Sequence, residues 1–391
     1  TRKRGRGWEY RIETVPIKGK RQQHSKGGFS TKREAQQAGK DALREYQTCG
    51  VCAEPVNMSF ADYLDYWMEH YCRVNLKRTT CEGYERHIRN HLKPALGHYQ
   101  IQSFSPLALQ NYINSFFQAG YSRNSVSVVK GILSGAFRYA VSYAGFLTVN
   151  PMTAVKMPHR RAQARVPTRK KKREALTIDQ WQAIINRFPE GHSCHLPLML
   201  AYHLGLRLGE TFGLCWEDVD FDNGTISINR QVQWNRDEKC WEFTDPKYDS
   251  FRTVSADPIL MALLEKEKKK QERAKAYFEE RYQQVCVNER QQIGREGTPV
   301  QLINVRENGS YIQPRVTQNM NYIVHTQLGL PLFDFHTLRH THATALMEAG
   351  ANMVDIQERL GHAKLEMTWR YAHDTDVIRR RTAALLAELY R

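Results

Sequence analysis

The sequence predicts a multidomain, mainly α-helical protein, in which a small strand-and-helix domain precedes a helical domain and a larger α+β domain. Its 391 residues exceed one ordinary domain, and a hydrophobic share of 41% is enough for packed cores. Helix-like periodicity fills most of the chain, whereas strand-like alternation is confined to its beginning and to a central stretch. No apolar run approaches the roughly 20 residues of a membrane helix, and no secretory segment opens the chain. We therefore expect a soluble, cytoplasmic protein.

The expected domain boundaries follow from changes in composition and from helix breakers. Asn150-Pro151 would close the helical domain, and a basic stretch with Pro158 and Pro167 would follow as an extended linker. The five expected segments are a basic amino-terminal domain at 1–52, a helical domain at 56–150, the linker at 151–175, the α+β domain at 176–375 and a carboxy-terminal helix at 376–391.

The amino-terminal domain shows the pattern of a small sheet with one packed helix. Residues 7–30 alternate as two strands do, with a turn around Gly19. Ser30 or Thr31 can then cap a helix, and Glu34 is placed to complete a capping box. Many small ββα units share this pattern, so it indicates a fold more than a function.

The next hundred residues predict a helical bundle. Residues 58–74 carry large apolar side chains at i, i+3, i+4 and i+7, and we interpret this aromatic stripe as core. Three further helices are expected at 78–96, 105–119 and 123–144. The exposed side of this bundle would carry the basic residues Lys77, Arg78, Arg86, Arg89, Arg123 and Lys130.

The remaining chain mixes helices and strands. Thr177 is expected to cap a helix, and a strand at 225–228 is expected to pair with one at 231–234 and to have another neighbour at 252–254. Residues 284–313 give only weak strand and loop signals. Further helices are expected at 257–283, 315–328, 337–349, 352–360, 366–372 and 376–390.

Charge points to a polyphosphate partner. The net charge is +16 and the pI near 9.5. Residues 1–50 hold 13 Lys or Arg against 5 Asp or Glu, and 156–173 hold nine basic residues and no acidic one. Unbroken runs of one sign favour nucleic-acid contact over an ordinary solvated surface. The linker residues expected to follow a phosphate backbone are Arg169, Lys170, Lys171 and Lys172. We interpret their similarity to a nuclear localisation signal as a coincidence of composition.

The eight cysteines give little sign of metal or redox chemistry. Only Cys49 and Cys52 have ligand-like spacing, and no second pair accompanies them, so zinc binding there is the weaker interpretation. We expect the other six to be reduced, small hydrophobic side chains.

Six residues in five short segments carry the strongest functional signal. Arg207 precedes Glu210 by three residues after a Gly-Leu pair, and Lys247 follows in a polar loop. The remaining four are His336 and Arg339 in a His-x-x-Arg motif, His362 in Leu-Gly-His, and Tyr371 nine residues later. Each alone would be unremarkable, but their order and spacing are hard to obtain by chance.

This ordered set resembles that of the tyrosine recombinase (phage integrase) family, firmly over about 176–375 and by architecture over 1–150. The resemblance implies an arm-type DNA-binding domain at the amino terminus, a helical core-binding domain and a catalytic domain. It also implies site-specific recombination of double-stranded DNA at core and arm sites, without metal, ATP or other cofactor. A homotetramer would exchange strands through a Holliday junction, with accessory directionality or DNA-bending proteins as further partners. The amino-terminal domain favours the integrase of a bacterial mobile element, phage or conjugative transposon, acting at the nucleoid.

The resemblance assigns each motif residue a role that suits its chemistry. Guanidinium groups stay charged and can bind two phosphate oxygens at once, which suits Arg207 and Arg339. A phenol needs electrostatic help or a base to attack phosphorus, so Tyr371 is the expected nucleophile. The expected roles of the others are proton removal by His336, a phosphate hydrogen bond from His362, leaving-group protonation by Lys247 and support from Glu210.

Several alternatives stay open at this point. Lys239 is the fallback for Lys247, and a histidine zinc cluster is disfavoured because no His-Glu-x-x-His helix is present. His340 and His342 are expected to be structural. The last helix would dock on a neighbouring subunit or pack in cis. The rival functions are a type IB-like topoisomerase and a non-catalytic DNA-binding regulator.

Overall fold

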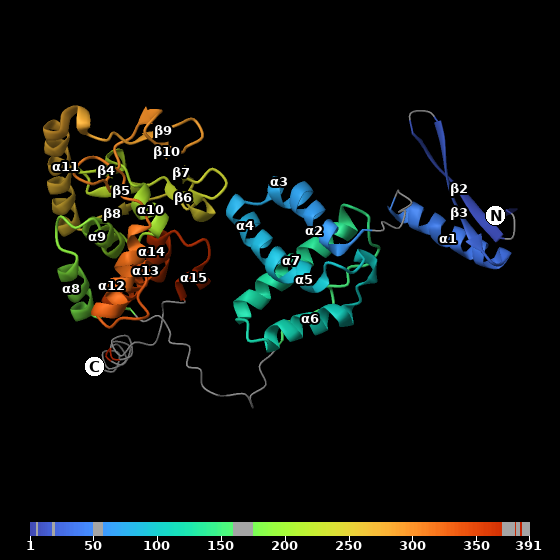
Figure 1. Cartoon of the computed structure of the whole chain (residues 1–391). Coiled ribbons are helices and arrows are strands. Elements are labelled where there is room, and N and C mark those ends of the chain that lie inside the picture. The colour runs from blue at the N-terminus through green and yellow to red at the C-terminus, as the bar shows by residue number, and fades with distance from the viewer. Residues whose placement is uncertain are drawn as a thin grey trace. The chain divides into compact units, whose positions relative to one another are not determined.

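The computed structural model describes residues 1–4, 7–17, 20–49, 58–158 and 175–369, together with 380 and 384. The chain divides into two compact units, Thr1–Val166 and Pro167–Arg391, so that the division falls within the linker expected from composition. We call these the amino-terminal and carboxy-terminal units. Figure 1 shows their elements, which are described below unit by unit. No helix among the described residues is long and apolar enough to cross a membrane.

The chain opens with an antiparallel sheet and one helix. The strands are β1 (Arg2–Arg4), β2 (Gly7–Ile17) and β3 (Lys20–Phe29), in the order β1-β2-β3, followed by α1 (Lys32–Cys49). The capping box is confirmed with Thr31: its hydroxyl accepts from the amide of Glu34 at 3.2 Å, and the Glu34 carboxylate accepts from the amide of Thr31 at 3.3 Å. Tyr10 and Ala35 are buried between the sheet and the helix. The expected turn at Gly19 lies outside the described residues.

The helical bundle forms as expected, with corrected helix limits. Its helices are α2 (Phe60–Trp67), α3 (Arg73–Asn75), α4 (Arg78–His87), α5 (Lys93–Leu96), α6 (Pro106–Gln118) and α7 (Arg123–Ser142). The hydroxyls of Ser59, Ser105 and Ser122 cap α2, α6 and α7.

The helices expected at 58–74 and 78–96 are each interrupted by one π-helical turn, at Met68–Cys72 and Ile88–Leu92. In the second, the amide of Lys93 donates to the carbonyl of Ile88 five residues earlier. Pro94 follows directly, and because proline has no amide hydrogen and its ring crowds the preceding turn, the regular pattern cannot continue there.

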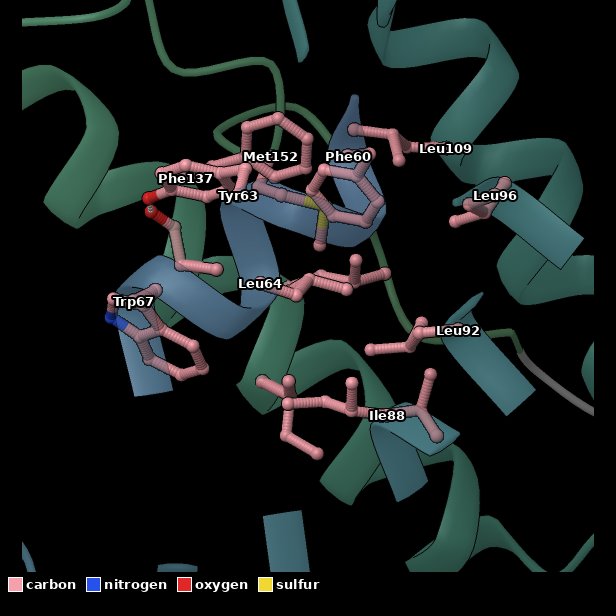
Figure 2. Packing of buried hydrophobic residues seen from close by; sticks show 14 of the residues in the cluster. Phe60, Tyr63, Leu64, Trp67, Ile88, Leu92, Leu96, Leu109, Phe137 and Met152 are labelled. Atoms are coloured by element: carbon pink, nitrogen blue, oxygen red, sulfur yellow. Dashed lines mark hydrogen bonds between the residues drawn. The ribbon is translucent and has the colours of Figure 1, made fainter. Parts of the chain in front are cut away.

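A single apolar core holds the bundle together (Figure 2). Phe60 and Phe137 stack at 5.3 Å between ring centroids, and Trp67 of the same core is almost fully buried. The Tyr63 hydroxyl is buried too, and it donates to the carbonyl of Ala136 at 2.5 Å. Each fully buried aromatic side chain contributes about 1.5–3 kcal/mol to stability through removal from water, so the aromatic stripe is core, as its spacing predicts.

The carboxy-terminal unit is mainly helical (Figure 1). Its helices are α8 (Ile178–Arg187), α9 (His195–Leu204), α10 (Leu208–Gly213), α11 (Pro258–Phe278), α12 (Val316–Gln327), α13 (Phe335–Ala349), α14 (Met353–Leu360) and α15 (Leu365–Trp369). Thr177 caps α8 with Gln180 completing a capping box, as expected. Helix α9 packs against α13 and α10, which brings the segments around 205–210 and 335–342 together.

The strands of this unit pair differently from the expectation. Strand β5 (Thr225–Ile228) lies between β4 (Val219–Asp220) and β8 (Arg252–Ser255), whereas β6 (Gln231–Asn235) pairs with β7 (Cys240–Thr244). The expected pairing of 225–228 with 231–234 is therefore wrong. The two connecting residues lack the glycine that tight hairpin turns favour, and Arg230 is instead drawn to Asp218 and Glu217 at 2.9 and 2.7 Å.

Short strands account for the weak signals between 284 and 313. They are β9 (Cys286–Val287), β10 (Ile293–Gly294) and β11 (Thr298–Pro299), and they form a small antiparallel sheet in the order β10-β9-β11. Two-residue strands carry no readable alternation in sequence. All six cysteines of the described residues with placed side chains are free, and all but Cys240 are buried.

Candidate active site

Two tight left-handed turns shape the site. Gly205 ends α9 with φ 66°, and Gly361 ends α14 with φ 64°. A Cβ atom at Gly205 would come within 2.7 Å of the His342 ring, and one at Gly361 within 2.9 Å of Ser250. Both positions thus require glycine for conformation and for space.

Arg207 is held by contacts to three separate segments. It directly precedes α10, and the Glu210 carboxylate three residues on accepts its backbone amide at 2.9 Å and its guanidinium at 2.5 Å. The guanidinium also donates to the Ser250 hydroxyl at 3.0 Å and to the Gly361 carbonyl at 2.8 Å. A long flexible side chain is therefore fixed in one orientation before any ligand arrives.

Arg339 lies within α13 and is only 1% exposed. Asp334 caps this helix, which begins at Phe335, two residues before the expected start. The Arg339 guanidinium donates to the carbonyl of Gly205 at 2.9 Å and to that of Leu360 at 2.6 Å.

The two guanidiniums converge on one short segment. Arg339 binds the carbonyl of Leu360, and Arg207 binds that of Gly361, the very next residue. Residues 132 positions apart in sequence are thereby brought to the same turn, directly before His362.

His362 is buried and neutral. Its Nδ1 lies 2.8 Å from the Thr368 hydroxyl of α15. Burial lowers the pKa of His362, and the positive charges of Arg339 and Arg207 lower it further, to about 3. The imidazole therefore carries no charge at neutral pH.

His336 stands in the first turn of α13, three residues before Arg339, so the expected helical turn is present. Its side chain is exposed, and its charge is one of the smaller causes that lower the pKa of His362. His336 and His362 therefore lie within electrostatic reach of one another.

Lys247 lies in a helical turn between β7 and β8, with its ammonium group 5.1 Å from the Tyr248 ring centre. It is not in the turn of a two-stranded hairpin. Strands β5 and β8 pair, and the connection between them contains both the β6–β7 hairpin and Lys247. Lys239 lies in the tight turn of that hairpin, at the end remote from β8. Because Ser250 of the Lys247 turn contacts Arg207, the geometry favours Lys247 over Lys239.

Tyr371 lies outside the described residues. In sequence it comes two residues after Trp369, where helix α15 ends. The same helix carries Thr368, which contacts His362. Apart from residues 380 and 384, the expected tail helix at 376–390 likewise lies outside the described residues. So do Cys52 and the basic linker residues Arg169, Lys170, Lys171 and Lys172.

His340 and His342 are buried in α13 and make internal contacts. Arg359 donates to Nε2 of His342 at 2.9 Å, so Nδ1 carries the hydrogen that reaches the Tyr202 carbonyl, also at 2.9 Å. Burial, with the nearby charge of Arg359, lowers the pKa of His342 to about 4. His340 contacts the Thr344 hydroxyl at 3.3 Å. These contacts agree with the structural role expected for both.

The basic residues expected on the bundle differ in exposure. Lys77, Arg86, Arg89 and Arg123 are exposed, and Lys130 is half-buried. Arg78 is also half-buried and pairs with Glu82 at 3.0 Å, so part of its charge is already compensated. Residues 123 and 130 are seven apart on α7 and thus share one side of it.

Sequence reasoning missed two arginines that organise the site. Arg252 donates to the Glu210 carboxylate at 2.8 and 3.3 Å, and Arg359 holds His342 and the Ser255 carbonyl. Both are paired with residues far away in sequence, so no local pattern marks them. Thr368 was missed too, because a lone threonine six residues after His362 belongs to none of the motifs.

Comparison with known proteins identifies the class. Residues 174–377, more than half of the chain, match the phage integrase family; 59–117 match the phage integrase N-terminal SAM-like domain and 1–46 an arm DNA-binding domain. The chain therefore belongs to the phage integrase family. It is an enzyme, a tyrosine site-specific recombinase of the integrase type found in mobile elements.

Individual relatives agree with this assignment. A "Tyrosine recombinase XerC-like" protein of Caldanaerobacter subterraneus subsp. tengcongensis is 26% identical over 348 residues, covering 86% of this chain and 84% of its own length. The Tn1549 transposon integrase, in complex with a circular intermediate DNA, shares the fold with a TM-score of 0.65 at 20% identity, covering 84% of this chain and 99% of that one. A lambda integrase tetramer bound to a Holliday junction has a TM-score of 0.52 at 16% identity, covering 90% and 91%.

Proposed function

We propose that this recombinase cleaves and rejoins double-stranded DNA through a covalent 3′-phosphotyrosine formed at Tyr371. The observation that carries the proposal is the convergence of Arg207 and Arg339 on the consecutive carbonyls of Leu360 and Gly361. Two fixed guanidiniums beside one another suit a phosphodiester whose two non-bridging oxygens gain charge as phosphorus becomes five-coordinate.

Each bond change has a group to carry it. The Tyr371 oxygen attacks phosphorus while the bond to the 5′ oxygen breaks, so that the phosphate passes from the 5′ oxygen to the tyrosine. The phenolic proton is taken with the help of His336, and Lys247 protonates the departing 5′ oxygen. The reverse steps with a new 5′ hydroxyl rejoin the strand, so neither water nor an external energy source is consumed.

Thr368 supports the proposed role of His362. If the threonine hydroxyl donates to Nδ1, the neutral imidazole keeps its hydrogen on Nε2 and can donate it to a phosphate oxygen. The lowered pKa of His362 means that this donor is uncharged before DNA binds. The charge of the site then comes from the arginines.

We further propose that four subunits act together on two duplexes and pass through a Holliday junction, as the lambda integrase tetramer bound to such a junction suggests by similarity. The amino-terminal sheet would bind arm-type sites, the helical bundle core sites, and the linker the intervening backbone. Accessory directionality or DNA-bending proteins would act with them, at the bacterial nucleoid.

A nicked suicide duplex tests the chemistry. Cleavage of such a duplex releases a short strand that carries the free 5′ hydroxyl. Without this strand the break cannot be rejoined, and the protein stays covalently bound to DNA. We expect a protease-sensitive adduct with the wild-type chain and none with Tyr371→Phe, while both bind the duplex equally. A wild-type chain that binds DNA without forming an adduct would contradict the proposal and favour a non-catalytic regulator.

A further inference from the structure

Arg252, at the start of β8, is a buried guanidinium tied to the site although no motif contains it. Its side chain is 7% exposed, and it forms a two-pronged ion pair with Glu210, whose side chain is fully buried. Its Nε donates to the Arg359 carbonyl at 2.8 Å and its Nη1 to the Ser250 carbonyl at 3.2 Å. Arg252 thus joins β8, the Lys247 turn, α10 and the end of α14.

The charges of this cluster have a consequence for Arg207. Glu210 is shared by two guanidiniums, Arg207 at 2.5 Å and Arg252 at 2.8 Å. One carboxylate between two arginines leaves a net charge of +1. Without Arg252, Glu210 and Arg207 would form a neutral pair, and in a site shielded from water a neutral pair attracts a phosphate far less than a net positive charge does.

Glu210 itself is charged at every pH of interest. Burial on its own would raise the pKa of Glu210, but the hydrogen bond and charge of Arg252, together with Arg207, outweigh it and lower the pKa to about 2. The carboxylate is therefore a permanent negative charge beside the arginine that is to bind phosphate, and it needs a permanent counter-charge.

We propose that Arg252 is a positioning residue of the recombination site: it offsets the charge of Glu210, so that Glu210 can orient Arg207 without neutralising it. Arg252 does not touch the phosphate in this proposal. It also fixes the Ser250 backbone, and through it the turn that carries Lys247. The inference rests on the proposed DNA cleavage and adds to it a requirement for net charge.

The first experiment compares Arg252→Gln with a matched control. Single-turnover cleavage of the nicked duplex at saturating protein is expected to slow about 100-fold in Arg252→Gln, with DNA affinity changed less than threefold. Arg230→Gln is the control, because Arg230 also pairs with a buried carboxylate of this unit, Asp218 at 2.9 Å, but has no contact to Arg207 among the interactions described. Equal rates for the two variants would overturn the proposal.

A second substitution separates charge balance from packing. In the Arg252→Gln background, Glu210→Gln removes the offending negative charge and restores the net +1. We expect the double variant to cleave at least about tenfold faster than Arg252→Gln alone, although it has lost more native contacts. A double variant that is as slow or slower would show that Arg252 acts through packing, and the proposal would fall. Should Arg252→Gln fold poorly, Arg252→Lys, which keeps the charge but loses the fork, is expected to retain most of the rate.

A third experiment changes the charge of the substrate. A duplex with a methylphosphonate at the scissile position has one fewer negative charge there, so the deficit of Arg252→Gln should shrink at least about fivefold on it. An unchanged deficit contradicts the proposal. If the wild-type chain forms no adduct on any duplex, the proposed function falls and this inference with it; if the wild type reacts and Arg252→Gln reacts equally fast, only the inference falls.

Discussion

The helical bundle at 58–158 and the carboxy-terminal unit at 175–369 bury different kinds of side chain. The bundle has one continuous apolar core, and no charged, amide, imidazole or aliphatic hydroxyl side chain among its described residues is buried. The described part of the carboxy-terminal unit has several smaller apolar clusters, and it buries Glu210, Arg339 and His362 as well. Under the proposed function, the difference implies that the bundle would act through its surface, whereas the carboxy-terminal unit would hold its reactive groups in its interior.

Loss of a buried guanidinium should have the largest effect of all. Arg339→Gln is expected to slow adduct formation by at least about 10³-fold, because Arg339 is both an anchor of the Leu360 turn and a proposed phosphate ligand. The measurement is single-turnover cleavage of the nicked duplex. Arg187→Gln, which removes a half-buried arginine hydrogen-bonded to Gln327, should leave the rate unchanged. If Arg339→Gln cleaves at a rate within tenfold of the wild type, Arg339 is not a phosphate ligand of the site.

A cavity in the bundle should cost stability and little chemistry. Phe137→Ala is expected to lower the free energy of unfolding of the bundle by about 3–5 kcal/mol, because Phe137 is fully buried against Phe60 and Phe104. Urea titration of the full chain measures the loss. Under conditions where the bundle remains folded, cleavage at saturating protein should stay within threefold of wild type. A loss below about 1 kcal/mol would mean that the core relaxes around the missing ring.

Acid should weaken the carboxy-terminal unit before the bundle. The pKa values of His362 and His342 are lowered to about 3 and about 4, against an ordinary value of 6.5, so the unfolded chain binds more protons below pH 6.5. Stability is then complete above pH 6.5 and falls by about 1 kcal/mol per pH unit for each histidine down to about pH 4. Glu210, with its pKa lowered to about 2, adds a loss only below about pH 4.5.

Thermal unfolding from pH 7.5 to 5 measures this acid effect. His342→Gln should flatten the dependence by about half, since one of the two imidazoles with the most strongly lowered pKa is gone. A wild-type unfolding temperature that is constant from pH 7.5 to 5 would contradict the depressed pKa values.

Surface charges of the bundle should have the smallest effects. Arg123→Gln and Lys130→Gln are each expected to weaken DNA binding several-fold and to lower the slope of log affinity against log salt by about 1, with unchanged cleavage at saturation. Arg78→Gln is the internal comparison, and its effect should be smaller because Arg78 already pairs with Glu82. If the slope of log affinity against log salt were the same for all these variants and the wild type, DNA would not bind at this surface of the bundle.

The same contrast explains which features the sequence could predict. The bundle helices follow from apolar periodicity, and the caps at Thr31 and Thr177 follow from local hydrogen-bonding chemistry, so both were predictable. The site motifs were recognisable as a spaced set. By contrast, Arg252 forms hydrogen bonds with the Glu210 carboxylate, 42 residues away in sequence, and with the Arg359 carbonyl, 107 residues away. Such pairings form only in the folded chain, and no local sequence pattern predicts them. The same holds for the pairing of β6 with β7.

The most direct test of the central claim is the structure of the Tyr371→Phe chain bound to a duplex that contains its cleavage site. The account predicts that the two non-bridging oxygens of one phosphate lie within hydrogen-bond distance of the guanidiniums of Arg207 and Arg339. It also predicts that His362 Nε2 lies beside those oxygens and that the aromatic ring at position 371 faces the phosphorus. A complex in which every phosphate lies outside the reach of both guanidiniums would contradict it.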